Sequence, residues 1–235
     1  MNPCIVSFFM NNINPKTVEM QKAVVDKYNP SKVPHLHINT QMRHGDSMDY
    51  FWLMNDVECE TMKGNTPQQK LDFDVVLFLD IDALPLHERA IDQTLQYAEE
   101  GFLVGNIQRS NHIQNDQHVF VAPSCVAVRR DVYQNMGAPT ARETARSDVA
   151  EEYTFLAELS EVPVKFYMPL RYDAPPIRFE WEKNQPPYWD LKDGMPKYGV
   201  GTTFGDGEKE MFWHNFQSFH PGQQERFWAK CESLL

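Results

Sequence analysis

Short apolar runs alternate along this chain with longer amphipathic segments. The runs with the length and composition of strands are residues 4–10, 33–38, 75–79, 102–107, 119–128 and 162–168. The segments with apolar residues at helical spacing are residues 15–28, 91–101, 149–156 and 227–234. This alternation predicts an α/β fold in which helices flank a central, mixed and mostly parallel sheet, in one domain that spans residues 1–235.

The strand predicted over residues 75–79 ends at two acids, Asp80 and Asp82. Side chains two apart on a strand share a face, so this Asp-x-Asp triplet aims both carboxylates at one spot. Two acids are costly to bury unpaired, but together they can bind a divalent cation. Solvated loop acids or a helix cap explain an isolated Asp-x-Asp about as well. The buried strand directly before it favours a site at the carboxyl edge of the sheet.

Two classes of enzyme place Asp-x-Asp after a buried strand. Glycosyltransferases of the GT-A type use it to hold Mg²⁺ or Mn²⁺ against the diphosphate of a nucleotide sugar. Phosphatases of the haloacid dehalogenase type follow it with Gly-Thr, where this chain has Ala83 and Leu84. The phosphatase alternative would use Asp80 as nucleophile and residues 205–208, Gly-Asp-Gly-Glu, as its later acids. A third alternative is a non-catalytic GT-A-like module that binds a nucleotide or a glycan.

Composition limits the partners of this chain. Its 235 residues carry a formal net charge of -11, which repels nucleic acid and anionic membranes. The amino terminus lacks the basic region of a signal peptide, and no apolar run approaches the length of a membrane span. We therefore expect a soluble, cytoplasmic protein. An enzyme this acidic that takes a diphosphate substrate needs local positive charge, which a metal ion held by acids supplies.

Two polar segments are candidates for the nucleotide donor. Asn12 lies in the turn after the first predicted strand, and Arg43 and Asp49 lie at the start of an amphipathic segment. We expect Arg43 to meet a phosphate and Asp49 to accept a hydrogen bond from a ribose or a base. Asp46 and Asp49 could instead form a capping box at a helix start.

The second half of the chain offers candidates for an acceptor site. Residues 169–198 mix prolines with aromatic residues, which is typical of a lid or a binding loop. Trp181 and Trp189 could stack on a sugar, although a loop that packs on its own aromatic residues is an equal alternative. We expect residues 1–100 to hold the nucleotide and residues 101–235 the acceptor.

A late histidine is the candidate for a third metal ligand. His214 ends the apolar segment 210–213. A lone histidine in such a run is usually a core residue, but this one follows an Asp-x-Asp. Imidazole with two carboxylates suits Mn²⁺ better than Ca²⁺.

The order of these motifs resembles that of GT-A glycosyltransferases. The segments that carry the resemblance are CIVSFFMNNINP, RHGDSMDYF, VVLFLDIDALPL, VAPSCVAVRRDVY, DVAEE, GVGTTF and MFWHNF. Their order and content are similar to those of the small amino-terminal glycosyltransferase domain of a large algal (chlorella) virus and its relatives. The resemblance implies a hexosyltransferase of glycan biosynthesis with Mn²⁺ or Mg²⁺ as cofactor, a UDP-sugar donor and a glycan or other hydroxyl acceptor. A viral origin would place the protein in the host cytoplasm.

The resemblance also implies roles for individual residues. Asp80 would contact the ribose or the metal, Asp82 would ligate the metal, and His214 would complete its coordination. Asp148 or Glu151 would deprotonate the acceptor or stabilise positive charge at the anomeric carbon. The spacing of Asp148 and Glu151 is also that of a capping box.

Arg43 and Asp49 would help to bind the nucleotide. No second basic residue stands beside the Asp-x-Asp to balance the diphosphate. We therefore expect either that Arg109 or Arg129 reaches the site or that the metal acts nearly alone.

Overall fold

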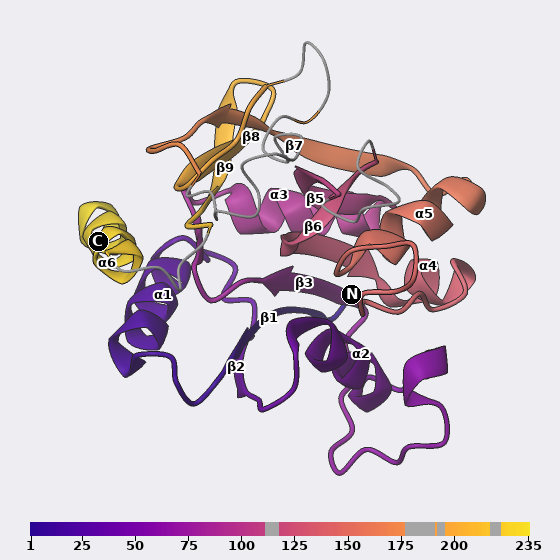
Figure 1. Ribbon diagram of the computed structural model, residues 1–235. Helices are drawn as coiled ribbons and strands as arrows, with labels where there is room; N and C mark the ends of the chain where they lie inside the picture. The colour runs from indigo at the N-terminus through magenta and orange to yellow at the C-terminus, as the bar shows by residue number, and fades with distance from the viewer. Residues whose placement is uncertain (111–117, 177–190, 192–195, 217–221) are drawn as a thin grey trace.

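The computed structural model describes residues 1–110, 118–176, 191, 196–216 and 222–235 (Figure 1). Its strands are β1 (Pro3–Phe9), β2 (His35–Asn39), β3 (Val75–Leu79), β4 (Ala83–Pro85), β5 (Leu103–Arg109), β6 (Val119–Arg129), β7 (Val164–Arg171), β8 (Thr202–Asp206) and β9 (Lys209–His214). Its helices are α1 (Pro15–Lys27), α2 (His44–Met54), α3 (Ala90–Glu99), α4 (Arg130–Asn135), α5 (Glu151–Leu159), α6 (Gln223–Leu234) and the 3₁₀ turn η1 (Glu60–Met62). The predicted strands and helices are all present, whereas the apolar pattern did not predict the short strands β4, β8 and β9.

In the described part of the chain the strands form one nine-stranded sheet, in the order β2-β1-β3-β6-β5-β7-β8-β9-β4. The pairs β1–β2, β1–β3 and β5–β7 are parallel, and the other five pairs are antiparallel. The predicted α/β class is confirmed, but the prediction of a mostly parallel sheet is wrong. Parallel neighbours need a crossover of a dozen residues or more. Only residues 110–118 connect β5 to β6, and only residues 207 and 208 connect β8 to β9, so these pairs are antiparallel.

The central strand β3 is buried on both faces. Val75, Leu77 and Leu79 pack in one core cluster together with α3, whereas Val76 and Phe78 pack in a second cluster with α2, α4 and α5. A strand covered on both sides needs no polar face, which explains the continuous apolar run in the sequence.

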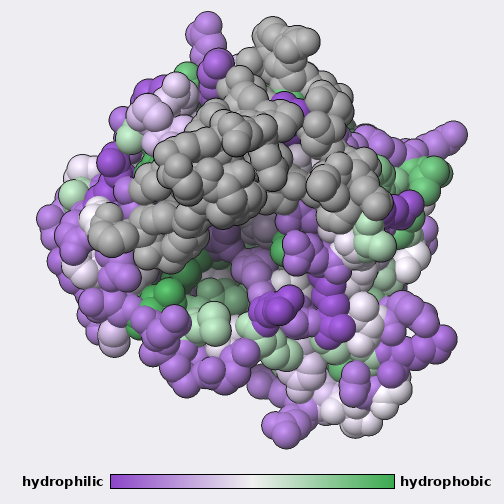
Figure 2. Space-filling model, in the orientation of Figure 1, coloured by the Kyte–Doolittle hydropathy of each residue, from purple (hydrophilic) through white to green (hydrophobic). Residues whose placement is uncertain are grey.

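The carboxyl ends of several strands lie at one edge of the sheet. β1, β3 and β5 point in the same direction, because β6 runs antiparallel to both β3 and β5. Helix α6 packs beside α1 near this edge (Figure 1). The face seen in Figure 2 is hollowed near its centre, and both hydrophobic and hydrophilic residues border the hollow. Within the described ranges, no helix has the length and apolar character that crossing a membrane requires.

Candidate metal and donor site

Asp80, Asp82 and His214 meet at the carboxyl end of β3. His214 Nε2 lies 3.2 Å from Asp82 Oδ1 and 3.5 Å from Asp80 Oδ2. The exposed fractions of the three side chains are 21% for Asp80, 11% for Asp82 and 8% for His214. Two acids from the first half of the chain and an imidazole from its last strand therefore form one largely buried cluster.

A turn and a strand pair bring these side chains together. After β3, Ala83 N donates to Asp80 O over 2.9 Å, which turns the chain into β4. β4 pairs antiparallel with β9 so that Ala83 lies opposite His214, and Asn215 N donates to Asp82 O over 3.1 Å. The two carboxylates thus converge through a turn, and not through the alternation of a continuing strand that the sequence predicted.

The cluster has the donor atoms that a divalent cation needs. One ligand atom from each of the three side chains lies within 4.8 Å of the other two. Carboxylate oxygens are the ligands that Mg²⁺ and Mn²⁺ prefer, and an imidazole nitrogen is also accepted by Mn²⁺. Two buried acids this close together are costly without positive charge between them. The residues present therefore fit Mn²⁺ or Mg²⁺.

The charges of the cluster are strongly coupled. Burial by itself would lower the pKa of His214, but Asp82 and Asp80 raise it to about 9. Burial would raise the pKa of Asp80, yet His44 and His214 hold it below its usual value. A cation that enters this site must therefore displace a proton from His214 at neutral pH.

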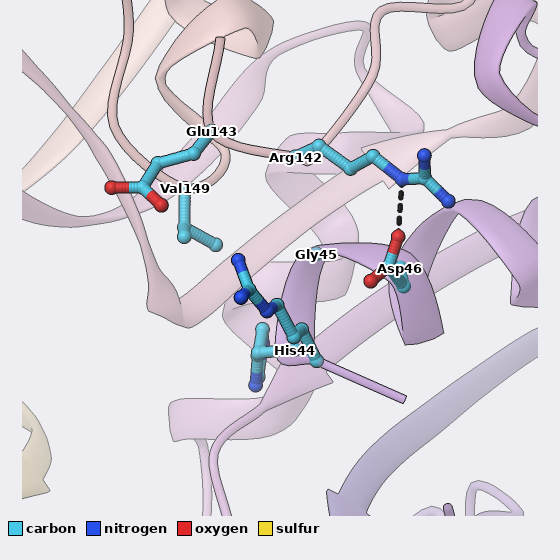
Figure 3. Close-up of a pocket in the computed structure, with 7 residues that line it drawn as sticks. His44, Gly45, Asp46, Arg142, Glu143 and Val149 are labelled. Carbon is cyan, nitrogen blue, oxygen red and sulfur yellow. Dashed lines mark ion pairs between the residues drawn. The ribbon is translucent and has the colours of Figure 1, made fainter. Parts of the chain in front are cut away.

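His44, which the sequence did not predict as a site residue, links the acids to a neighbouring hollow. Its Nδ1 lies 3.3 Å from Asp80 Oδ1. The hollow has a volume of about 240 Å³. The residues that line it are Arg43, His44, Gly45, Asp46, Arg142, Glu143 and Val149 (Figure 3). Two arginines thus line a hollow that His44 connects to the acid cluster, and Arg142 forms an ion pair with Asp46 (Figure 3).

A close backbone contact places Arg142 beside Arg43. A Cβ atom on Gly45 would lie 2.4 Å from Ala141 O, so only glycine lets α2 approach this segment so closely. Arg142 is distant from α2 in the sequence, and no local pattern predicts the contact. Arg142 was not among the basic residues that the sequence predicted for the site.

Of the two arginines proposed to reach the acids, Arg129 lies elsewhere. Arg129 pairs with Val75, at the opposite end of β3 from Asp80, and forms an ion pair with Asp131. Arg109 is buried at the end of β5. The expectation for Arg129 is therefore wrong, because β6 runs antiparallel to β3 and carries that side chain away from the acids.

Asp49 does not face the hollow. Its side chain is fully buried, and its Oδ1 accepts from Ala141 N over 2.7 Å. Its Oδ2 accepts from the hydroxyl groups of Thr61 and Thr140, each over 2.6 Å. Burial raises the pKa of Asp49, although these three hydrogen bonds oppose the shift. The predicted contact with a donor is therefore wrong for Asp49, since its carboxylate already joins α2 to η1 and to the loop at Thr140 and Ala141.

The carboxylate of Glu151 is also bound by groups in the protein interior. It is fully buried, its Oε2 accepts from Ser110 Oγ over 2.7 Å and from Asp148 N over 2.6 Å, and its Oε1 lies 2.6 Å from His118 Nδ1. Helix α5 begins at Glu151 with Ala150 as its N-cap and no side-chain cap, so Asp148 and Glu151 do not form the capping box that their spacing suggested. Asp148 is half-buried and accepts from Val149 N over 2.7 Å. The carboxylate of Glu151 therefore joins the start of α5 to Ser110 and His118, and the catalytic role of Asp148 stays a prediction.

Asn12 lies on the other side of the acid pair. It is exposed, and it lines a second hollow of about 200 Å³ together with Asp82. Further residues that line this hollow are Ile13, Thr17, Ile81, Gln224 and Phe227. Trp181 and Trp189, the predicted acceptor residues, lie outside the described residues.

The later acids of the phosphatase alternative do not join Asp80. Asp206 lies four residues along β8 from Thr202, which pairs with His214. At about 3.3 Å per strand residue this separation is about 13 Å. Asp206 also forms an ion pair of 2.6 Å with Lys165 and accepts from Tyr97 Oη over 2.7 Å. The arrangement therefore disfavours a phosphatase.

Comparison with known proteins gives only distant matches. No protein-family model matches the sequence, and no curated protein shows significant similarity to it. One match is a mutant of Drosophila β1,4-galactosyltransferase 7 in complex with manganese, UDP-Gal and xylobiose, which is 12% identical with a TM-score of 0.39. The match covers 69% of this chain and 64% of the galactosyltransferase chain, so this chain spans less than two thirds of that length. An active-site mutant of LgtC is 13% identical with a TM-score of 0.42, over 97% of this chain and 95% of that one.

A third solved structure is a glycosyltransferase involved in the glycosylation of the major capsid of PBCV-1. It is 12% identical with a TM-score of 0.38, and the match covers 98% of this chain and all of that one. All three TM-scores are below 0.5, so the functional assignment depends on the residues of this chain.

Replacing Asp49 with alanine should destabilise the protein. Asp49→Ala removes the acceptor of one buried backbone donor, Ala141 N, and of two partly buried hydroxyl groups. We expect the free energy of unfolding, measured by urea denaturation, to fall by about 3 kcal/mol. Asp26→Ala is the matched control, because Asp26 is an exposed acid that makes one surface ion pair, and it should have little effect. Unchanged stability in Asp49→Ala would contradict the structural role.

Metal binding should release a proton. Because the pKa of His214 is raised to about 9, its imidazole is protonated at neutral pH when no metal is bound. We expect the apparent Mn²⁺ affinity to rise about tenfold per pH unit from about pH 6 to pH 8, since protons compete with the cation. Calorimetry in buffers of different ionisation enthalpy counts the protons released. An affinity that does not change over this range would show that His214 is not a ligand.

Proposed function

We propose that this chain is a metal-dependent GT-A glycosyltransferase that transfers a sugar from a nucleotide sugar, most favourably a UDP-sugar, to a glycan or another hydroxyl acceptor. The observation that carries the proposal is the convergence of Asp80, Asp82 and His214 beside a hollow that two arginines line. A nucleotide diphosphate requires a metal ion, which the acids can hold, and positively charged side chains that bind its phosphates, which the arginines supply.

In this proposal the three clustered side chains would hold Mn²⁺ or Mg²⁺. The metal, when bound, would neutralise the negative charge that develops on the departing diphosphate. The rest of the catalytic effect falls to residues of the chain that bind and orient the donor and the acceptor.

The donor diphosphate is assigned to the hollow beside α2. Arg43 and Arg142 line this hollow, and planar guanidinium groups bind phosphate oxygens in pairs. His44 lies between the hollow and Asp80, so a phosphate there would be close to the acid cluster. Local positive charge matters in this protein because its net charge of -11 repels nucleotides at long range.

Asp148 is the residue proposed for the acceptor side of the site. We assign the removal of the acceptor proton to Asp148, because the carboxylate of Glu151 is occupied by buried hydrogen bonds. Asp148 precedes Val149, which lines the donor hollow. The division into a nucleotide half, residues 1–100, and an acceptor half, residues 101–235, remains a proposal. The site itself draws on both halves, since Arg142 and His214 come from the second.

The decisive experiment measures nucleotide release from a panel of nucleotide sugars with Mn²⁺. We expect release of UDP that requires metal and falls about 100-fold or more in Asp82→Asn, a loss of about 2.7 kcal/mol in transition-state stabilisation. Asp206→Asn is the matched control, since Asp206 is a partly buried acid outside the cluster, and it should retain activity.

Three other outcomes would overturn the proposal. Release of UDP at the wild-type rate in Asp82→Asn would show that Asp82 does not bind a metal needed for the reaction. Tight binding of Mn²⁺ and UDP without any sugar transfer or hydrolysis would indicate a binding module. Hydrolysis of a simple phosphate ester that disappears in Asp80→Asn, with UDP-sugars left intact, would indicate a phosphatase.

Arg142 gives a second test of the donor site. Arg142→Gln keeps most of the side-chain length but removes the charge, so we expect the KM for the donor to rise about tenfold, the loss of one charge-assisted hydrogen bond. Arg129→Gln, at the far end of β3, is the control and should leave the KM unchanged. Steady-state kinetics with a range of donor concentrations measures both. Equal KM values for Arg142→Gln and the wild type would exclude the hollow as the diphosphate site.

A further inference from the structure

Side chains of β1 and α1 donate hydrogen bonds to the main chain around the two acids. Ser7 Oγ donates to Leu79 O over 2.7 Å. Gln21 Nε2 donates to Asp80 O over 2.6 Å and to Ala83 O over 3.3 Å. Two side chains therefore bind three carbonyl groups of the turn that carries Asp80 and Asp82.

Each of these two side chains is itself bound by a histidine of β2. His35 Nε2 lies 2.9 Å from Ser7 Oγ, and His37 Nε2 lies 3.0 Å from Gln21 Oε1. The two imidazole rings are neighbours, with centroids 3.9 Å apart. The contacts form two series of hydrogen bonds. One runs from His35 through Ser7 to the Asp80–Asp82 turn, and the other runs from His37 through Gln21 to the same turn.

The direction of the hydrogen bonds follows from their ends. The carbonyl groups can only accept, so the Ser7 hydroxyl and the Gln21 amide donate to them. Ser7 Oγ and Gln21 Oε1 then accept, which requires a proton on Nε2 of both His35 and His37. Among the described residues His35 Nδ1 has no partner, as suits a nitrogen without a proton.

The network is uncharged; its inner side chains are buried, whereas His35 and His37 are half-buried. Ser7 and Gln21 are fully buried. Burial, assisted by His37 and Lys22, lowers the pKa of His35 to about 3, and burial also lowers the pKa of His37. Neutral rings at this distance do not repel each other, so both series of hydrogen bonds can form at once.

We propose that Gln21 and Ser7, oriented by His37 and His35, are positioning residues that fix the Asp80–Asp82 turn in the geometry that binds the divalent cation. This inference rests on the proposed function, because it assumes that the turn binds a metal. In this proposal none of the four side chains is itself a metal ligand. They act through the backbone of residues 79–83, whose carbonyl positions determine where the carboxylates stand relative to His214.

The test measures Mn²⁺ affinity directly, by following free Mn²⁺ with electron paramagnetic resonance during titration of the full chain. Gln21→Met keeps the size of the side chain but removes its hydrogen bonds. We expect the dissociation constant for Mn²⁺ to rise about tenfold to 100-fold, as when outer partners of metal ligands are removed. The spectrum of bound Mn²⁺ should also change, which a loss of stability alone would not cause.

Two further variants complete the experiment. Ser7→Ala should weaken Mn²⁺ binding in the same direction, and it decides the matter if Gln21→Met does not fold. Thr94→Val is the matched control, because Thr94 is a fully buried residue whose hydroxyl bonds to Ala90 O and Tyr167 Oη within the α3 core cluster. It should lose stability but retain the wild-type Mn²⁺ affinity and spectrum.

The outcomes separate this inference from the proposed function. Wild-type affinity and an unchanged spectrum in folded Gln21→Met and Ser7→Ala would overturn the positioning role while the metal site remains. A wild-type protein that binds no Mn²⁺ would overturn the metal site, and the positioning role with it. An equal loss of affinity in Thr94→Val would show a general effect of stability and would also overturn the inference.

Discussion

The pairing of β4 with β9 is the interaction on which the site depends. It spans only three residue pairs, yet it places Ala83 opposite His214 and so brings an imidazole from the end of the chain to acids that follow β3. Leu84 and Trp213, also paired, are fully buried in a cluster with Val24, Phe227 and Cys231. Burial of this cluster between α1 and α6 supplies the hydrophobic free energy that keeps so short a strand pair in place.

Electrostatic balance is the second constraint. Two acids at the end of a buried strand repel each other and lose hydration. Neighbouring imidazole and amide groups offset this cost. His214 and His44 lie against the carboxylates, and the hydrogen bonds of Gln21 hold the backbone that carries them. The same arrangement leaves the cluster able to accept a cation, because a divalent ion can replace the proton on His214.

Asp49 and Glu151, two acids that were candidates for the site, are both bound within the protein. In the sequence each fits a ligand contact and a capping contact equally well. The structure turns both carboxylates inward, where Ala141 N, Ser110 Oγ and other donors satisfy them. Ala141 and Ser110 are distant in the sequence from the acids that they bind, so local sequence could not separate a ligand contact from an internal one.

The sequence by itself determined the α/β class, most of the strands and helices and the position of the acid pair, because these depend on the periodicity of apolar residues and on local turn chemistry. It also pointed to His214, since a histidine at the end of an apolar run late in the chain suited a site with two acids. The antiparallel insertion of β6, the approach of Arg142 to Arg43 and the contact of Gln21 with the Asp80 turn were decided only by the tertiary structure. These contacts join segments far apart in the chain, and the packing of the whole sheet, which no local pattern records, determines which of them meet.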